Sequence, residues 1–285
     1  NEGGFSFGHK RLKIIDLHDC SNQPFRFHHL TIVFNGEVYN YLELRSELEK
    51  LGHQFTTSSD TEVICAAYLE WKEACLDRFI GMWALVLWDE KEHVGFIARD
   101  RFGQKPLYYS NEGGHLYFGS EIKAVMGLRA TNHVAPHFAK SIERPLRYEA
   151  MSESLVQGIH RFPAGHFAWL RKGETTLQPQ RYWDTREHIE TVPGRFEDQV
   201  EGLRERFEEA SKIRLRADVP IATALSGGVD SSVIYASIQH HLGDKRINHK
   251  AITADYGTSS IDETPYAMKV AAHFGNTLEP VRIDA

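Results

Sequence analysis

Residues 220–232 read Pro-Ile-Ala-Thr-Ala-Leu-Ser-Gly-Gly-Val-Asp-Ser-Ser, and this stretch decides how the second half of the chain folds. An apolar run ends at Leu225, the loop Ser226 to Ser232 follows, and apolar residues then recur every fourth position up to Leu242. This order predicts a strand, a Gly-rich turn and a helix. Two glycines let the backbone approach an anion closely, and a helix N-terminus offers free N–H groups. The loop therefore predicts a phosphate-binding site.

The same loop has no G-x-x-x-x-G-K-[ST] pattern and no lysine to reach the β- and γ-phosphates. It resembles instead the pyrophosphate loop of the ATP pyrophosphatases, which split ATP between its α- and β-phosphates. Magnesium is the expected cofactor, with Asp230 as its nearest carboxylate, although an aspartate there also suits a helix N-terminus. The residues expected to contact ATP are Leu225, Ser226, Gly227, Gly228, Val229, Asp230, Ser231, Ser232 and Ala254.

The chain around this loop alternates strands and helices. Strands are predicted at 220–225, 249–254 and 278–283, and helices at 231–242 and 263–274. A βαβαβ order of this kind gives a parallel sheet. Such a sheet normally has more strands, with helices on both faces, so we expect residues 196–285 to form the first part of an α/β domain.

Residues 1–170 predict a different class of domain. A β-branched and aromatic run from Leu30 to Phe34 ends at Asn35-Gly36, and an amphipathic helix follows it. A second helix begins at the capping box Ser59 to Glu62. Two hairpins, over 82–98 and 107–118, have short turns that require antiparallel pairing. We expect an antiparallel α+β domain, followed by a linker at 171–195.

The composition excludes several classes of protein. The 285 residues carry 33 Lys plus Arg against 39 Asp plus Glu, a net charge of −6, so nucleic acid is not an expected partner. No apolar run approaches the roughly 18 residues of a membrane span and the start does not resemble a signal peptide, which makes the cytoplasm the expected location. Cys20, Cys65 and Cys75 are far apart, so we expect neither a disulfide nor a zinc site.

A set of motifs covers nearly the whole chain. In the first half they are Gly8-His9-Lys10-Arg11-Leu12, Ile14-Ile15-Asp16, Gln23-Pro24, Asn35 to Asn40, Ser59 to Glu62 and Asp100 to Gly103. In the second half they are Asp218-Val219-Pro220, the Gly-rich loop and Asp262 to Ala267. Together they resemble the motifs of glutamine-dependent asparagine synthetases, a family of class II glutamine amidotransferases. The resemblance implies an N-terminal-nucleophile glutaminase domain, an αββα sandwich, joined to a parallel-sheet synthetase domain.

By that resemblance the first domain binds glutamine. Arg11 would pair with the α-carboxylate, and Asp60 and Glu37 would meet the α-amino group. Asn35 and the Gly36 N–H would form an oxyanion hole, although Asn-Gly by itself is a common turn. The residues expected to bind glutamine are Arg11, Leu12, Ile14, Ile15, Asn35, Gly36, Glu37 and Asp60. Asp100 and Arg101 are interpreted as a structural ion pair near a turn.

Two parts of the family pattern are not found. The nucleophile of these glutaminases is a cysteine at the mature N-terminus, but the first residue here is Asn1 and every cysteine is internal. Either the chain lacks its first few dozen residues or it descends from members that have lost glutaminase activity. A later S-G-x-G-x-D-E type segment is also absent, so we expect a portion of a longer protein.

The expected function is that of an ATP-dependent ligase. Glutamine would supply ammonia, and aspartate, activated as aspartyl-AMP, would become asparagine. Glutamine, aspartate and ATP are the expected partners, with a homodimer as a further hypothesis. One alternative is an amidotransferase acting on another carboxylate, such as a sugar acid or a small-molecule or peptide precursor. Others are a non-catalytic glutaminase-like scaffold, disfavoured by the intact polar set, and a nucleic-acid-modifying pyrophosphatase, disfavoured by the acidic balance.

Overall fold

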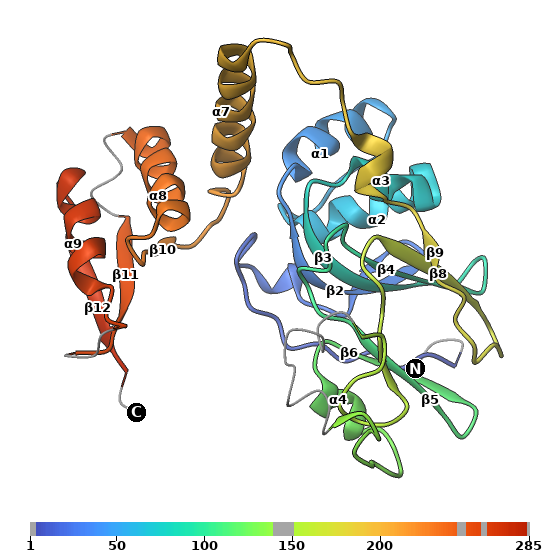
Figure 1. Cartoon of the computed structure of the whole chain (residues 1–285). Coiled ribbons are helices and arrows are strands. Elements are labelled where there is room, and N and C mark those ends of the chain that lie inside the picture. The colour runs from blue at the N-terminus through green and yellow to red at the C-terminus, as the bar shows by residue number, and fades with distance from the viewer. Residues whose placement is uncertain (1–3, 139–150, 244–248, 258–260, 284–285) are drawn as a thin grey trace. The chain divides into compact units, whose positions relative to one another are not determined.

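The computed structural model describes residues 4–138, 151–243, 249–257 and 261–283. The chain divides into two compact units, Asn1–Ile189 and Glu190–Ala285 (Figure 1). The first unit continues into the segment that the sequence suggested as a linker, because β9 (Gln180–Arg181) pairs with β8 (His166–Arg171). A 3-10 helix, Thr185–His188, follows β9.

The first unit is built on two antiparallel sheets, and both predicted hairpins are confirmed. The larger sheet has the order β1-β2-β3-β4-β8-β9 and the smaller has the order β6-β5-β7. The remaining strands of the larger sheet are β1 (Phe25–Phe27), β2 (Leu30–Val38), β3 (Gly81–Asp89) and β4 (Val94–Arg99). Those of the smaller sheet are β5 (Tyr108–Glu112), β6 (His115–Gly119) and β7 (Ile159–Arg161).

Helices cover one face of the larger sheet, and the smaller sheet packs toward the other. Along β2, Ile32 and Phe34 are buried with the helices, whereas Val33 belongs to the core between the sheets. This alternation is the period of two that a strand imposes. The helices of this unit are α1 (Tyr41–Lys50), α2 (Asp60–Trp71), α3 (Cys75–Arg78) and α4 (Ile122–Met126), with 3-10 turns at Asp19–Ser21 and Lys72–Ala74. The α+β class is confirmed.

The capping box at the start of α2 is only half formed. Ser59 caps the helix, because its hydroxyl accepts the Thr61 N–H at 3.1 Å. Glu62 does not reach back to Ser59 as the motif predicts. Its carboxylate accepts instead the N–H and hydroxyl groups of Thr56 and Thr57 in the preceding loop. The charge of Glu62 therefore fixes the loop that leads into α2.

Two sequence-based predictions, an ion pair between Asp100 and Arg101 and the absence of a disulfide, have different outcomes in the structure. The ion pair between Asp100 and Arg101 is wrong: Arg101 donates to the carbonyl of Asp77 and lies over the ring of Trp183. The carboxylate of Asp100 accepts backbone N–H groups instead. These donors satisfy the buried oxygens, so no cationic side chain is needed to compensate for their burial. The cysteines form no disulfide; Cys65 and Cys75 are buried and Cys20 is exposed.

The second unit is a parallel sheet with helices, as predicted. β10 (Ala222–Ala224), β11 (Lys250–Asp255) and β12 (Leu278–Arg282) lie in that order, and all pairs are parallel. The helices are α7 (Phe196–Ile213), α8 (Val229–Leu242) and α9 (Thr264–His273). Leu225, Tyr235 and Ala267 form its small core together with Ala251 and Ala271. In the described parts of the chain, no helix is long and apolar enough to cross a membrane.

Candidate functional site

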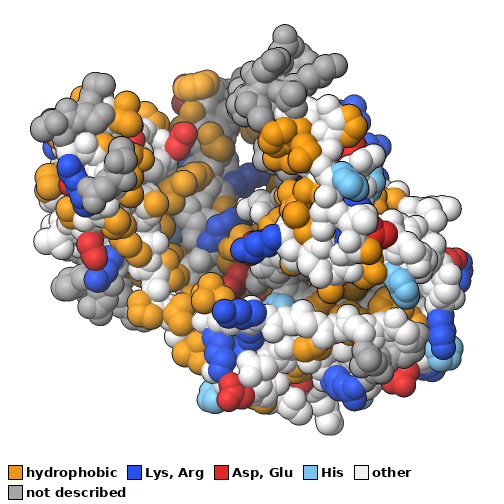
Figure 2. Space-filling view, turned by 90° about the horizontal axis from the view of Figure 1, so that it is seen from below, with side chains coloured by type: hydrophobic (Ala, Val, Ile, Leu, Met, Phe, Trp, Pro, Cys, Tyr) orange, Lys and Arg blue, Asp and Glu red, His pale blue; other side chains and the backbone are white. Residues whose placement is uncertain are grey.

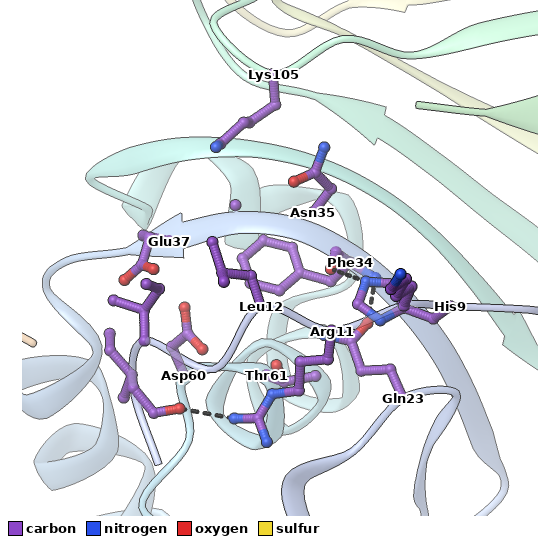
Figure 3. A pocket seen from close by; sticks show the side chains of 14 residues that line it. His9, Arg11, Leu12, Gln23, Phe34, Asn35, Glu37, Asp60, Thr61 and Lys105 are labelled. Atoms are coloured by element: carbon purple, nitrogen blue, oxygen red, sulfur yellow. Dashed lines mark hydrogen bonds between the residues drawn. The ribbon is translucent and has the colours of Figure 1, made fainter. Parts of the chain in front are cut away.

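The candidate site of the first unit is a small pocket where the end of β2 meets the start of α2. Its volume is about 150 Å³. Figure 3 shows that its side chains come from the 9–23 region, from β2 residues 34–37, from Asp60 and Thr61, and from Lys105. Four segments that are far apart in the sequence therefore converge on one polar cavity.

The backbones of β2 and β3 approach each other closely beside this pocket. A Cβ atom at Gly36 would overlap the carbonyl oxygen of Met82 and would lie 2.7 Å from the Cα atom of Trp83. A Cβ atom at Gly81 would overlap the carbonyl oxygen of Glu37. Both positions therefore require glycine, and Gly36 also has a φ of +153°. This close approach fixes the two residues that flank Gly36, Asn35 and Glu37.

Asp60 and Glu37 place two carboxylates in the pocket, as Figure 3 shows. Burial raises the pKa of Glu37 to about 7, and the charge of Asp60 contributes to that rise. Burial also raises the pKa of Asp60 to about 6, although the Val38 N–H donates to its Oδ2 at 3.0 Å. Among the described residues, the buried Oε2 of Glu37 accepts no hydrogen bond. This pair is suited to a small cationic group such as an ammonium ion.

Arg11 supplies a guanidinium group to the same pocket. It donates to the backbone carbonyls of Ile15 at 2.7 Å, Asp16 at 2.6 Å and His18 at 3.1 Å. These bonds use three of its five N–H groups, which leaves Nε–H and one Nη1–H for a ligand. An anionic group that accepts from Arg11 while an ammonium group meets the carboxylates would have the charge pattern of an amino acid.

Asp16 holds the loop that carries Arg11. Its carboxylate accepts the Ser21 hydroxyl at 2.7 Å, the His18 N–H at 3.0 Å and the Ser58 N–H at 2.9 Å. Burial raises the pKa of Asp16, but these hydrogen bonds outweigh it and hold the pKa well below its ordinary value. Asp16 stays ionised and ties the loop to the segment before α2.

Side chains support the backbone of β2 next to Asn35. The Phe34 N–H donates to Gln23 Oε1 at 2.6 Å, and the Phe34 carbonyl lies 3.1 Å from His9 Nε2. β1 does not reach this part of β2, because it begins at Phe25, which pairs with Ile32. Asn35 Nδ2 lies 3.4 Å from the Ser120 hydroxyl, a long hydrogen bond that a better acceptor can replace.

The structure brings together every residue that the sequence assigned to glutamine. All of them line this pocket: Arg11, Leu12, Ile14, Ile15, Asn35, Gly36, Glu37 and Asp60. Six further residues line the pocket and have no role predicted from the sequence: His9, Lys10, Gln23, Phe34, Thr61 and Lys105. Four lie inside motifs quoted above and one follows Val33 directly. Lys105 lies just after such a motif, and nothing local marks it.

The Gly-rich loop of the second unit forms the turn from β10 into α8. Gly227 has a φ of +83°, and a Cβ atom there would lie 2.6 Å from the backbone of α9, so only glycine fits. The hydroxyls of Ser226 and Ser231 lie 2.9 Å apart, and Ser226 Oγ accepts the Gly228 N–H at 3.2 Å. The Ser232 hydroxyl is buried and has no partner among the described residues. The loop thus offers hydroxyl and backbone donors at a helix N-terminus.

A second cavity lies at the carboxyl ends of β10 and β11. Its volume is about 400 Å³, and Leu225, Ser226, Ser231 and Ala254 line it. The other loop residues assigned to ATP, Gly227, Gly228, Val229, Asp230 and Ser232, do not line it. This edge of a parallel sheet is the usual place for a bound nucleotide, and the donors of the loop fit phosphate oxygens.

Asp230, the residue assigned to magnesium, is exposed in the first turn of α8. Within the described ranges, no group of three His, Cys, Asp or Glu side chains is placed to hold a metal ion. Magnesium at a nucleotide is commonly bound by one or two carboxylates together with phosphate oxygens. An exposed carboxylate beside the Gly-rich loop fits that arrangement, so the magnesium assignment stays a prediction.

Comparison with known proteins matches both units. The family described as "Glutamine amidotransferase domain" matches residues 1–183, and that described as "Asparagine synthase" matches residues 202–285. Glutamine-hydrolyzing asparagine synthetase 3 of Bacillus subtilis (strain 168) is 34% identical, over 95% of this chain and 46% of that protein. Amidase chry2 of Gibberella zeae is 33% identical, over 97% of this chain and 43% of that protein.

The chain spans less than half the length of these curated relatives. Among solved structures, the glutamine phosphoribosylpyrophosphate amidotransferase of B. subtilis, complexed with ADP and GMP, matches with a TM-score of 0.40 and 16% identity. That match covers 89% of this chain and 61% of the other. From the two family matches, which follow one another along the sequence, this chain belongs to the glutamine amidotransferases that join a glutaminase-type domain to an asparagine synthase domain.

Proposed function

We propose that this protein is a glutamine-dependent asparagine synthetase. The first unit hydrolyses glutamine to glutamate and ammonia. The second unit binds ATP, so that an aspartate carboxylate attacks the α-phosphorus and forms aspartyl-AMP and pyrophosphate; ammonia then displaces AMP. The observation that carries the proposal is the pocket in which Arg11 faces two carboxylates, Asp60 and Glu37, because this arrangement matches a zwitterionic amino acid.

Each group of glutamine has a complementary side chain in this pocket. Arg11 binds the α-carboxylate through the N–H groups that its loop does not use. Asp60 and Glu37 bind the α-ammonium group, which supplies a partner for the buried Oε2 of Glu37. Asn35 and Gly36 then lie at the side-chain amide and stabilise the negative charge that develops on its oxygen.

The nucleophile of the hydrolysis is not found among the internal cysteines. Cys65 and Cys75 are buried in the core of the first unit, and none of the three cysteines lines the pocket. Burial raises the pKa of both buried thiols far above its ordinary value, so neither forms a thiolate at neutral pH. In this proposal the nucleophile is the N-terminal cysteine that is typical of the family.

In the second unit, the Gly-rich loop binds the phosphates of ATP. The first backbone N–H groups of α8 and the hydroxyls of Ser226, Ser231 and Ser232 are the donors. Bound magnesium would neutralise phosphate charge, with Asp230 as its carboxylate ligand from this chain. Leu225 and Ala254, at the ends of neighbouring strands, border the space for the adenosine. A cytoplasmic location belongs to the same proposal.

A related function differs only in the acceptor. The similarity to an amidase is nearly as strong as that to an asparagine synthetase, and neither described pocket contains a residue set that we can assign to aspartate. The competing proposal is therefore an amidotransferase acting on another carboxylate. Acceptor-dependent release of pyrophosphate separates the two: aspartate alone should stimulate release from ATP, and stimulation only by other carboxylic acids would support the alternative.

The substitution Arg11→Ala tests the glutaminase assignment. We expect the KM for glutamine to rise about 100-fold, because the α-carboxylate loses a charge-assisted hydrogen-bond partner. Ammonia-dependent synthesis should keep its wild-type rate, since ammonia bypasses the pocket. Steady-state assays with each nitrogen donor measure both effects. If ammonia-dependent turnover falls equally, Arg11 acts only by holding its own loop.

Glutamine binding should depend on pH through the carboxylate pair. In the free protein the pKa of Glu37 is about 7 and that of Asp60 about 6, and a bound ammonium ion favours the ionised form of both. Protonation therefore competes with binding as the pH falls below 7. Affinity should drop about tenfold or more between pH 8 and pH 6. Calorimetric titrations at both values measure this drop, and Glu37→Gln should make the dependence shallower.

A further inference from the structure

Lys105 has no role in the proposed function, yet the fold places its side chain at the pocket. It is half-buried and comes from the loop that follows β4, whereas the other lining residues belong to the 9–23 region, β2 and α2. Figure 3 shows its ammonium group on the side of Asn35 and Glu37, with the guanidinium of Arg11 on the opposite side. The two cations of Arg11 and Lys105 are thus separated across the pocket.

The loop that carries Lys105 is held by hydrogen bonds to two buried charged side chains, Asp100 and Arg99. The carboxylate of Asp100, which is fully buried, accepts the N–H groups of Trp83 at 3.2 Å, Phe102 at 3.1 Å, Gln104 at 2.9 Å and Lys105 at 2.9 Å. Because Trp83 pairs with Gly36 across the sheet, this carboxylate ties the loop directly to the strand that bears Asn35.

Arg99 holds the same loop through its side chain. Its guanidinium donates to the carbonyls of Lys105 at 2.7 Å, Gly103 at 2.7 Å and Phe162 at 2.6 Å. All the bonds that Asp100 and Arg99 make with Lys105 go to its backbone. The side chain is therefore presented from a rigid base without being needed to form that base.

The position of the ammonium group matches the place where charge develops in amide hydrolysis. When a thiolate attacks the carbonyl carbon of the γ-carboxamide of glutamine, the thiolate electron pair forms the new C–S bond and the carbonyl π pair moves to oxygen. That oxyanion collapses as the C–N bond breaks, and the nitrogen takes a proton and leaves as ammonia; water then releases glutamate from the thioester. A cation on the side of Asn35 stabilises the oxyanion, and it also attracts the γ-carboxylate of the product.

We propose that Lys105 is a catalytic residue of the glutaminase site, whose ammonium group joins Asn35 and Gly36 in stabilising the oxyanion at the γ-carbonyl. This inference rests on the proposed function, because the reaction it concerns is the hydrolysis of glutamine. A cation on the amide side should contribute little to binding neutral glutamine and much to the transition state. The expected signature is a loss of kcat with little change in KM.

Three variants of the full protein test this role. Lys105→Met should lower kcat for glutamate release about tenfold to 100-fold, with KM for glutamine within about threefold of wild type. Lys105→Arg should recover most of that loss because it keeps a cation. Lys91→Met, at an exposed lysine in the β3–β4 turn, is the matched control and should leave both constants unchanged. Ammonia-dependent synthesis should be unchanged in all three.

The outcomes separate this inference from the proposed function. An active wild type in which Lys105→Met keeps its kcat, or raises only KM, overturns the role of Lys105 and leaves the glutaminase standing. If wild type releases no glutamate, the proposed function fails, and titration calorimetry still tests Lys105. Lys105→Met should then weaken binding of glutamate at least about tenfold more than binding of glutamine, because only glutamate has a γ-carboxylate. Equal weakening of both would overturn the inference.

Discussion

Gly228→Val should reduce ATP–pyrophosphate exchange more than about 100-fold while the second unit stays folded. Gly228 precedes the first turn of α8, where the free N–H groups of the helix bind phosphate oxygens in our proposal. A Cβ atom there meets only the Ser226 hydroxyl, at 3.4 Å, so the fold tolerates a side chain. The added isopropyl group instead occupies space that the phosphates need and shields those donors. Isotope exchange between pyrophosphate and ATP measures the loss.

Gly202→Ala is the matched control for this substitution. Gly202 lies in α7, and a Cβ atom there has nothing within 4 Å, so alanine should keep the exchange rate and stabilise the helix slightly. Glutamine hydrolysis should continue in both variants, because the two units are separate compact bodies. Full exchange activity in a folded Gly228→Val protein would remove the Gly-rich loop from the ATP site.

Asp60→Asn should reduce glutamine-dependent synthesis at least about 100-fold. Asp60 is buried, and in our proposal its charge is the closest partner of the α-ammonium group, so an amide leaves that cation without compensation. Burial raises the pKa of Asp60 to about 6, so at pH 8 Asp60 is ionised and its buried charge lowers the stability of the folded state relative to the unfolded state. The asparagine variant should therefore unfold at an equal or higher temperature than wild type.

This combination distinguishes a binding residue from a structural one. Asp77→Asn, at an exposed position in α3, is the control and should change neither activity nor the unfolding temperature. Steady-state assays with glutamine and with ammonia, together with thermal unfolding at pH 8, give the required readings. A loss of glutamine-dependent activity that accompanies a lower unfolding temperature and a loss of ammonia-dependent activity would mean that Asp60 only maintains the fold.

The sequence predicted much of the local structure because the relevant signals are local. One helical repeat ends before Gly52 and another begins after Ser59. These repeats, the short hairpin turns and the strand–loop–helix order around Gly227 each depend on residues within a dozen positions of one another. The parallel sheet of the second unit and the antiparallel sheets of the first were predicted from these signals. The observed ends differ from those expected by a few residues, as for β2, which runs on to Val38.

The interpretations that differed from the structure concern charged side chains with more than one available partner. Glu62 has the spacing of a capping box, but the loop before α2 supplies better donors. Asp100 adjoins an arginine, but backbone amides surround it. A carboxylate accepts from whichever donors the fold buries beside it, and sequence neighbours do not determine that choice.

What the sequence by itself determined is the set of chemical groups: a Gly-rich turn before a helix, an arginine, two carboxylates and an Asn-Gly pair in recognisable motifs. Only the tertiary structure decided that these groups meet in one pocket, that Glu37 and Asp60 acquire raised pKa values and that Lys105 joins them. The physical reason is that desolvation and Coulomb interactions depend on burial and on distances through space. Gly36 and Met82 lie 46 positions apart, yet the contact of their backbones across β2 and β3 shapes the pocket.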